Sequence, residues 1–269
     1  MALSRRNKRS ARVAGIFPML VGLAAVSVLV ALVYLSVSQQ PAVYNEETLC
    51  LVGEPPSSVL AIVIDGTDEI PSVIAKKAIS EINKSVGAAA PNTLVNLYTI
   101  SASSGESMTA AVSLCKPRDG SDADELTECP GCMETRFEAR FEQPVARILD
   151  SLMSAKPAGR SPILESLKGA VVDSFVGVDS GIRKELLVVS DLLQHSSFYS
   201  FYAGVPSFED FEEALVSEGI GSMDLLEAEV HFLVVPRQRP ADSFKEVAWF
   251  WRQFLTNQNA GLGSTWEPL

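Results

Sequence analysis

A run of 24 residues near the amino terminus, at positions 14–37, reads AGIFPMLVGLAAVSVLVALVYLSV and contains no charged side chain. At about 1.5 Å per residue, a helix of this length spans about 36 Å, more than the ~30 Å hydrocarbon core of a bilayer. Because lipid offers the backbone no hydrogen-bonding partners, such a segment has to be helical. The sequence therefore predicts one transmembrane helix over residues 13–37, retained as an anchor. A cleaved signal peptide is the alternative.

Charge is distributed unevenly on the two sides of this run. Residues 1–12, a basic head, carry five Lys and Arg and no acid, whereas the whole chain has a formal net charge of −11, so the remainder carries −16. The basic residues before the span predict a cytoplasmic amino terminus. We therefore expect a single-pass protein of the cytoplasmic (inner) membrane whose domain is periplasmic or extracellular. The acidic body has no basic field to hold phosphates, which argues against nucleic acid as a partner.

The rest of the chain predicts a tether followed by one folded domain. Residues 38–56 are rich in Pro, Gly and polar side chains, which is typical of a tether, and the domain is expected over 57–269. Continuous apolar runs are typical of parallel strands buried on both faces. Such strands are expected at 59–64, 93–100, 185–191 and 229–236, and helices at about 70–86, 144–153, 161–176 and 243–257.

Strands that alternate with helices indicate an α/β fold with a doubly wound, mostly parallel sheet and helices on both faces. Residues 101–133 interrupt this alternation and are expected to form an irregular, Cys-containing insertion.

Two of the predicted strands end in a carboxylate, Asp65 and Asp191, and Ser161 opens a predicted helix. In a doubly wound sheet the loops at the carboxyl ends of the strands converge, so these three side chains are expected to lie together. Oxygen ligands are those that a hard divalent cation prefers. Each residue also has a purely structural explanation as a helix cap or turn residue.

These segments resemble the metal-ion-dependent adhesion site of the von Willebrand factor A domain family. That site uses Asp-x-Ser-x-Ser after the first strand, a Thr in a middle loop and an Asp after the fourth strand. Here the segments read DGTDE at 65–69, GRSPILESL at 159–167 and LVVSD at 187–191. The resemblance covers roughly 57–257 and implies a von Willebrand A-like, Rossmann-like domain that binds Mg²⁺ or Mn²⁺. The implied metal ligands are Asp65, Thr67, Glu69, Ser161 and Asp191.

Two positions depart from the family pattern. Glu69 stands where the second serine is expected, and Leu192 replaces the usual glycine after Asp191. A carboxylate at position 69 would occupy the metal and weaken the capture of a partner's carboxylate. The acids Asp65, Asp68, Glu69 and Asp191 would also crowd together, and without a cation some would take up protons more readily than usual.

Four cysteines lie in the predicted exported part: Cys50, Cys115, Cys129 and Cys132. The last two form a CPGC motif, for which a redox site, a zinc site with Cys115 and structural disulfides are the alternatives. Structural disulfides fit an oxidising compartment best. A bond from Cys115 to Cys129 or Cys132 would fix the insertion, but four cysteines allow three pairings and the sequence does not choose between them.

The residues expected to contact a partner are Asp68, His195, Trp249 and Trp251. His195 follows Asp191 by four residues, which predicts a place at the rim of the site, although a solvated loop residue is the alternative. Trp249, Phe250 and Trp251 cannot all face one side of a helix, so core packing is expected for at least two of them.

The predicted function is that of a membrane-anchored protein-binding module that recognises a protein partner in a cell-envelope assembly with the assistance of Mg²⁺ or Mn²⁺. A metal-independent scaffold is the first alternative. A metal-dependent hydrolase or a thiol oxidoreductase is the second. No general base beyond the acids is evident and neither histidine lies in a nucleophile motif, so we do not expect an enzyme.

Overall fold

The computed structural model describes residues 21–34, 43–104, 107–121, 123, 128–152, 158–197, 199–202, 204–205, 207–217, 223–237 and 241–269. The chain divides into two units, Met1–Val43 and Tyr44–Leu269. In the first unit, residues 21–34 are helical and their apolar side chains are exposed. Among the described residues, no helix combines the length and the apolar character needed to cross a membrane. The predicted span lies in part outside the described residues, at 13–20 and 35–37.

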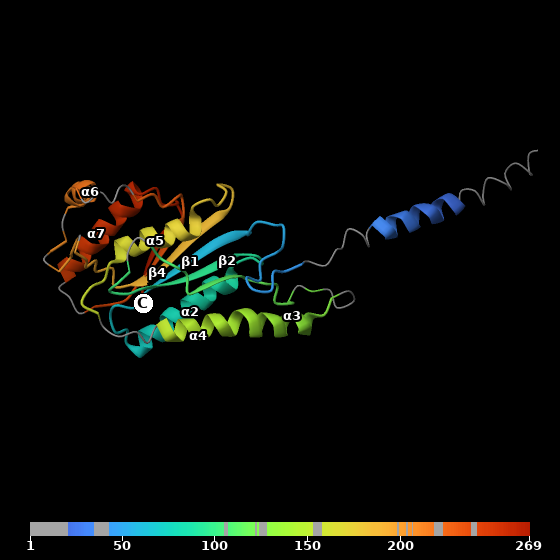
Figure 1. Ribbon diagram of the computed structural model, residues 1–269, viewed down its shortest axis with the longest axis horizontal. Coiled ribbons are helices and arrows are strands. Elements are labelled where there is room, and N and C mark those ends of the chain that lie inside the picture. The colour runs from blue at the N-terminus through green and yellow to red at the C-terminus, as the bar shows by residue number, and fades with distance from the viewer. Residues whose placement is uncertain are drawn as a thin grey trace, which may run out of the picture. The chain divides into compact units, whose positions relative to one another are not determined.

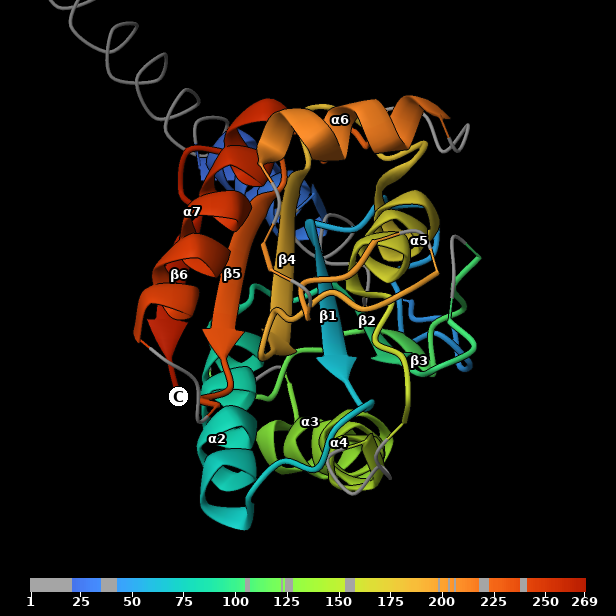
Figure 2. The ribbon, with the colours of Figure 1, turned by 90° about the vertical axis from the view of Figure 1, so that its left-hand side faces the viewer.

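Six strands of the second unit form one sheet in the order β3-β2-β1-β4-β5-β6 (Figure 2). β3 runs antiparallel to β2, and the other neighbours are parallel. The expected doubly wound, mostly parallel α/β sheet is therefore confirmed. The strands are β1 (Ser58–Asp65), β2 (Leu94–Ile100), β3 (Val112–Cys115), β4 (Arg183–Ser190), β5 (Glu229–Val234) and β6 (Thr265–Pro268).

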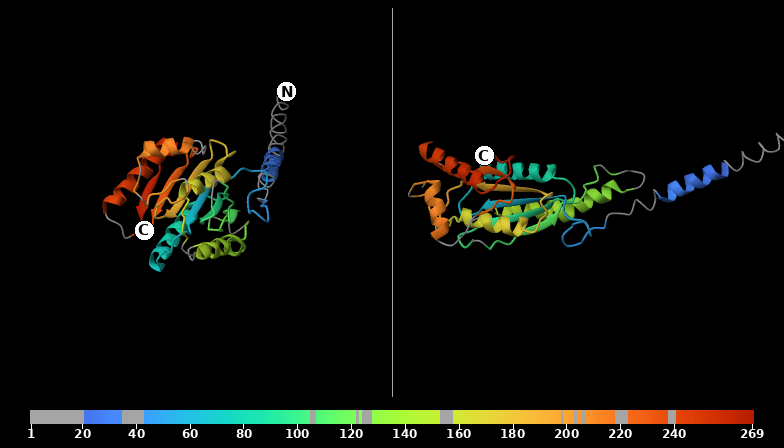
Figure 3. Two further views of the ribbon diagram at one scale, coloured as in Figure 1. Left: turned by 60° about the vertical axis from the view of Figure 1, so that its left-hand side comes forward. Right: turned by 90° about the horizontal axis from the view of Figure 1, so that it is seen from above.

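Helices cover both faces of this sheet (Figures 1 and 3). α2 (Ser72–Ala88) and α4 (Gln143–Leu152) pack on one face. α5 (Ile163–Phe175), α6 (Phe208–Ser217) and α7 (Ala241–Asn257) pack on the other. Side chains alternate along β1, so that Ala61 and Val63 join the core under α5 while Ile62 and Ile64 join the core under α2. Because both faces are covered, the strand is apolar at every position.

The helix expected at 144–153 begins earlier than predicted. α3 (Pro130–Phe137), a π-helical segment η1 (Glu138–Glu142) and α4 follow one another directly, so Pro144 lies inside a helical stretch. Proline lacks an amide hydrogen and its ring clashes with the carbonyl four residues before it, and the wider π-turn just before Pro144 accommodates both effects. The segment 101–133 was expected to be irregular. This expectation is wrong at 112–115, which form β3, and at 130–133, which form the start of α3.

Two disulfides join the four cysteines, Cys50 to Cys115 and Cys129 to Cys132. Disulfide bonding is confirmed, and of the three pairings that the sequence left open the structure has the one that does not join Cys115 to Cys129 or Cys132. Cys115 ends β3 beside the start of β2, where the segment before β1 reaches the sheet, and its amide donates to the Thr48 carbonyl at 2.8 Å. Cys129 and Cys132 instead lie in the first turn of α3. No cysteine is free, so neither the zinc site nor a reduced CPGC is present.

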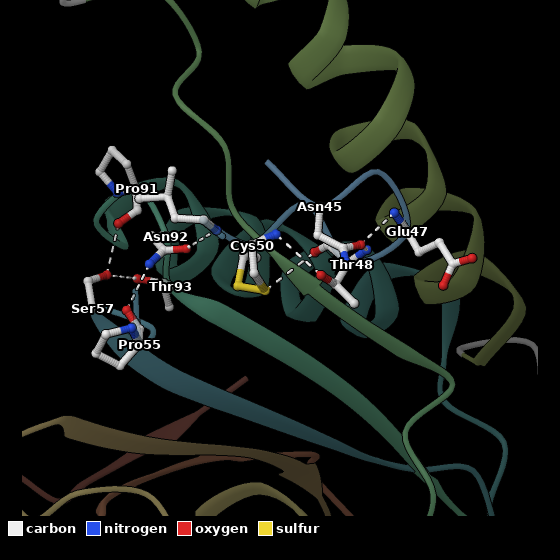
Figure 4. The surroundings of a disulfide bond; sticks show 11 residues. Asn45, Glu47, Thr48, Cys50, Pro55, Ser57, Pro91, Asn92 and Thr93 are labelled. Atoms are coloured by element: carbon white, nitrogen blue, oxygen red, sulfur yellow. Dashed lines mark hydrogen bonds between the residues drawn. A yellow bond between two sulfur atoms is a disulfide. The ribbon is translucent and has the colours of Figure 1, made fainter. Parts of the chain in front are cut away.

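Hydrogen bonds around Asn92 continue the attachment that the Cys50–Cys115 disulfide begins (Figure 4). The Asn92 Oδ1 accepts from the Leu51 amide at 3.0 Å, and its Nδ2 donates to the Pro55 carbonyl at 2.9 Å. Asn92 has φ 63°, a conformation that asparagine tolerates better than most residues. The compact unit consequently begins at Tyr44, and residues 44–56 of the predicted tether pack with the domain.

Candidate functional site

Three segments meet at the carboxyl edge of the sheet, the edge at which the parallel strands end. β1 ends at Asp65, and β4, its neighbour, ends at Ser190 just before Asp191. The loop before α5 joins them because Ser161 and His195 exchange two backbone hydrogen bonds, of 2.7 and 2.8 Å. The predicted convergence of the loops is therefore present, with Asp65 after the first strand and Asp191 after the fourth. The domain is von Willebrand A-like in this respect.

The buried carboxylate of Asp65 is the centre of this edge. Its Oδ1 accepts from the Thr67 amide at 3.1 Å and from the Thr67 hydroxyl at 2.6 Å. Its Oδ2 accepts from the hydroxyls of Ser161 at 3.1 Å and Ser190 at 2.8 Å. Two carboxylate oxygens offer about four acceptor sites, so these donors saturate Asp65. The structure thus brings together the predicted residues Asp65, Thr67 and Ser161 and adds Ser190.

The carboxylate of Asp191 faces an arginine. Its Oδ1 accepts from the Leu193 amide and its Oδ2 from the Arg237 Nε, both at 2.8–2.9 Å. Burial raises the pKa of Asp191 above its ordinary value, and the charge of Asp65 adds to this rise. The attraction of Arg237 opposes the rise without cancelling it.

Arg237 also pairs with Asp68, with 2.8 Å between the Arg237 Nη2 and the Asp68 Oδ2. Burial raises the pKa of Asp68 as well. Burial alone would lower the pKa of Arg237, but Asp191 and Asp68 together raise it. Arg237 thus bridges the loop after β1 and the loop after β4, a role that the sequence did not suggest.

The remaining predicted residues lie around this cluster or away from it. Glu69 is exposed, and its side chain has no hydrogen bond or ion pair within the described part of the chain. His195 is half-buried, with its Nδ1 2.8 Å from the Ser200 hydroxyl and its ring 4.9 Å from that of the exposed Tyr202. His195 therefore lies at the rim, as expected.

The two tryptophans of α7 have opposite environments. Trp249 is 63% exposed, whereas Trp251 is fully buried and its Nε1 donates to the Leu192 carbonyl at 3.0 Å. Residues two apart lie on opposite sides of a helix, so one of the pair had to face the sheet. The expectation that Trp251 contacts a partner is wrong. The expectation that at least two of the three aromatic residues at 249–251 pack in the core is confirmed by Phe250 and Trp251.

Leu192 has φ 60°, a conformation that favours glycine and that costs a branched side chain about 1–2 kcal/mol. In this chain the Leu192 side chain is fully buried in the core under α5, and burial of a leucine contributes about 1.5–3 kcal/mol, enough to offset the strain.

The side chains as arranged do not fit Mg²⁺ or Mn²⁺. Both oxygens of Asp65 are saturated by donors of the chain, and a guanidinium rather than open space faces Asp191 and Asp68. Across the described residues, no group of three or more His, Cys, Asp and Glu side chains is placed to hold a metal ion. Binding of either metal stays a prediction of the sequence pattern alone.

No protein-family model and no curated protein matches the chain. Solved structures with a similar fold include an aerotolerance-related membrane protein from Bacteroides fragilis, with 12% identity over 79% of this chain and 91% of that chain and a TM-score of 0.37. The von Willebrand A domain of SpRpn10 has 10% identity over 79% of this chain and 87% of its own, with a TM-score of 0.37. The PilB minor pilin from Streptococcus sanguinis has 8% identity over 81% of this chain and 58% of its own, with a TM-score of 0.44. These are likenesses of fold alone.

Proposed function

We propose that the chain is a protein-binding module whose carboxyl edge contacts a protein partner. One observation carries the proposal. The loops around the buried Asp65 are fixed against one another, and this edge presents two partly exposed charged groups, Asp68 and Arg237, the latter from the loop after β5, with the exposed aromatic ring of Tyr202 near Arg237. A rigid polar edge with an exposed aromatic side chain suits recognition of another protein, because little conformational freedom is lost on binding.

Binding is favoured over catalysis by the surroundings of a serine–histidine pair that resembles a nucleophile and its base. His195 contacts the Ser200 hydroxyl through Nδ1, within a local backbone bridge between the same two residues. In the described part of the chain no carboxylate bonds the His195 ring to orient it, as a triad requires. We therefore propose a non-enzymatic role.

We further propose that residues 13–37 anchor the module in the cytoplasmic membrane, with the domain on the outer side as part of a cell-envelope assembly. The basic head supports this orientation. The two disulfides support it independently, because such bonds persist in oxidising compartments. Protease added to intact spheroplasts should degrade residues 44–269, and protection of the domain until the cells are lysed would contradict the proposal.

Site-specific crosslinking of the full-length chain in its native membrane tests the binding edge. A photo-crosslinking amino acid at Tyr202, 57% exposed, should form an adduct with a partner protein, whereas the same group at Val52, 62% exposed near the opposite edge, should not. The adduct should weaken when Asp68→Lys reverses a charge of the edge. Equal adducts at both positions, or an adduct that Asp68→Lys leaves unchanged, would contradict a contact at this edge.

A further inference from the structure

Arg237 reaches the site from the end of β5. Hydrogen bonding of the Val235 amide to the Ser190 carbonyl, at 2.9 Å, extends the pairing of β5 with β4 just past the strand ends. Pro236 follows, and Arg237 then lies beside the loop that begins at Asp191. The strand order therefore fixes which side chain meets Asp191. The loop after β5 contributes a cation where the loops after β1 and β4 contribute acids.

The two ion pairs of Arg237 use different nitrogens and reach different loops. Nε bonds the Asp191 Oδ2 and Nη2 bonds the Asp68 Oδ2, each at 2.8 Å. The Asp191 side chain is only 3% exposed, whereas those of Arg237 and Asp68 are about one-third exposed. A guanidinium is suited to this position because it is planar, always charged and presents its donors in a fixed fork.

Charge explains why a cation is needed at this point. The carboxylates of Asp65, Asp68 and Asp191 are gathered at one edge, because Ser190, the residue before Asp191, donates to the Asp65 Oδ2 at 2.8 Å, and one guanidinium contacts both Asp68 and Asp191. The donors around Asp65 are a neutral amide and neutral hydroxyls, which satisfy its oxygens but leave its charge uncompensated. Arg237 is the cation that contacts the two other acids.

We infer that Arg237 is a built-in counter-ion that takes the place of a divalent cation at the carboxyl edge and ties the loops after β1, β4 and β5 together. The inference concerns how the edge is held and does not depend on whether a partner binds there. It predicts that the edge is complete without Mg²⁺ or Mn²⁺. It also predicts that, without the guanidinium, the repulsion between Asp68 and Asp191 destabilises the edge and that an added divalent cation reduces this repulsion.

The test uses the full-length chain in mild detergent, stripped of metals with EDTA, and thermal unfolding as the readout. Arg237→Gln is compared with Arg252→Gln, a matched substitution at an exposed arginine of α7. We expect Arg252→Gln to leave the Tm unchanged and Arg237→Gln to lower it by about 4 °C. On addition of 10 mM MgCl₂, the wild-type Tm should not change, whereas the Arg237→Gln variant should regain at least half of its loss.

Two further variants separate charge from shape. Arg237→Lys retains the charge, and its Tm should fall by less than that of Arg237→Gln. Combining Asp68→Asn with Arg237→Gln removes one acid together with the cation and should recover part of the loss. A saturable increase of the wild-type Tm with Mg²⁺ would overturn the inference. So would a loss in Arg237→Gln that neither Mg²⁺ nor Asp68→Asn reverses, because it would show that the shape of Arg237 matters and its charge does not.

Discussion

At the amino edge of the sheet, where the parallel strands begin, the segment before β1 is held by the Cys50–Cys115 disulfide and by the amide of Asn92. At the carboxyl edge, the loops are held by the saturated Asp65 and by the ion pairs of Arg237. The first set is covalent or neutral, and neither salt nor pH near neutrality changes it. The second set is charged, and charged contacts weaken with salt and respond to pH. The contacts of the amino edge should therefore be insensitive to salt and to pH near neutrality, whereas those of the carboxyl edge should depend on both.

The largest effect is expected from removal of the covalent bond at the amino edge. A Cys50→Ser/Cys115→Ser variant loses a link across 65 residues of sequence, and its free energy of unfolding should fall by about 4 kcal/mol. The matched control, Cys129→Ser/Cys132→Ser, opens a loop with a separation of 3 and should lose about 2 kcal/mol. Urea unfolding of both measures the difference. Equal losses would show that loop length does not decide the role of the Cys50–Cys115 bond.

The next effect concerns the neutral part of the amino edge. Asn92→Ala removes the side-chain bonds to Leu51 and Pro55 and places an alanine at φ 63°, so we expect a loss of about 2–3 kcal/mol. Asn92→Gly removes the same bonds but relieves the backbone, and it should lose about 1 kcal/mol less in urea unfolding. If the two variants lose the same amount, the left-handed backbone is not a source of strain.

A smaller effect is expected from a hydroxyl at the carboxyl edge. Ser190→Ala removes the 2.8 Å bond to Asp65, leaving one carboxylate oxygen with a single donor, and also removes the acceptor of the Leu192 amide; it should cost about 1–2 kcal/mol. Ser174→Ala, which removes a buried hydroxyl that bonds Tyr98 instead of Asp65, is the control. We expect 10 mM EDTA to change the loss of unfolding free energy in Ser190→Ala by no more than it changes the loss in the control Ser174→Ala. A larger loss in EDTA for Ser190→Ala alone would reveal a metal at this edge.

The smallest effect is a dependence of stability on pH. Because the folded-state pKa of Asp191 is raised, its contribution to stability is fully present below its unfolded pKa and is lost as the pH rises through the folded pKa. Relative to Asp191→Asn, the wild type should therefore gain stability as the pH falls from 7 toward 4. Asp119, whose pKa is lowered by its bonds to Ser121, should show the opposite sign in Asp119→Asn. The free energy of unfolding of each variant and of the wild type is measured in urea across this pH range. If both comparisons change with pH in the same direction, the raised pKa of Asp191 or the lowered pKa of Asp119 is wrong.

The long elements of the fold could be predicted from the sequence, and the short ones could not. β1 and β4 are buried on both faces, so their apolar runs are unambiguous. β3 and β6 have four residues each and lie at the sheet edges. Their side chains are exposed to different degrees, so the sequence shows neither a continuous apolar run nor a clear alternation of apolar and polar residues. The pairing of Cys50 with Cys115 could not be predicted because it depends on β3.

The candidate site likewise has residues that could be predicted from the sequence and one, Arg237, that could not. Asp65, Thr67 and Ser161 follow from a local motif at strand and helix ends, and the structure brings them together. Arg237 lies 46 residues beyond Asp191, and only the placement of β5 beside β4 brings the two together. A useful signal was present nonetheless: Arg237 is a basic residue directly after a predicted strand, at the edge where the acids were expected to collect.

The hydrogen bond from the Trp251 indole to the Leu192 carbonyl gives the carboxyl edge a natural optical reporter. Trp251 is buried against the loop that carries Asp191, whereas Trp249 is 63% exposed and Trp266, on the edge strand β6, packs against Phe232 of β5. A chain with Trp249→Phe and Trp266→Phe retains one tryptophan, and the emission of that tryptophan, excited at a wavelength that tyrosine does not absorb, follows this loop. Movement of the edge, whether driven by a partner, a cation or a proton, can then be timed directly in solution without an attached dye.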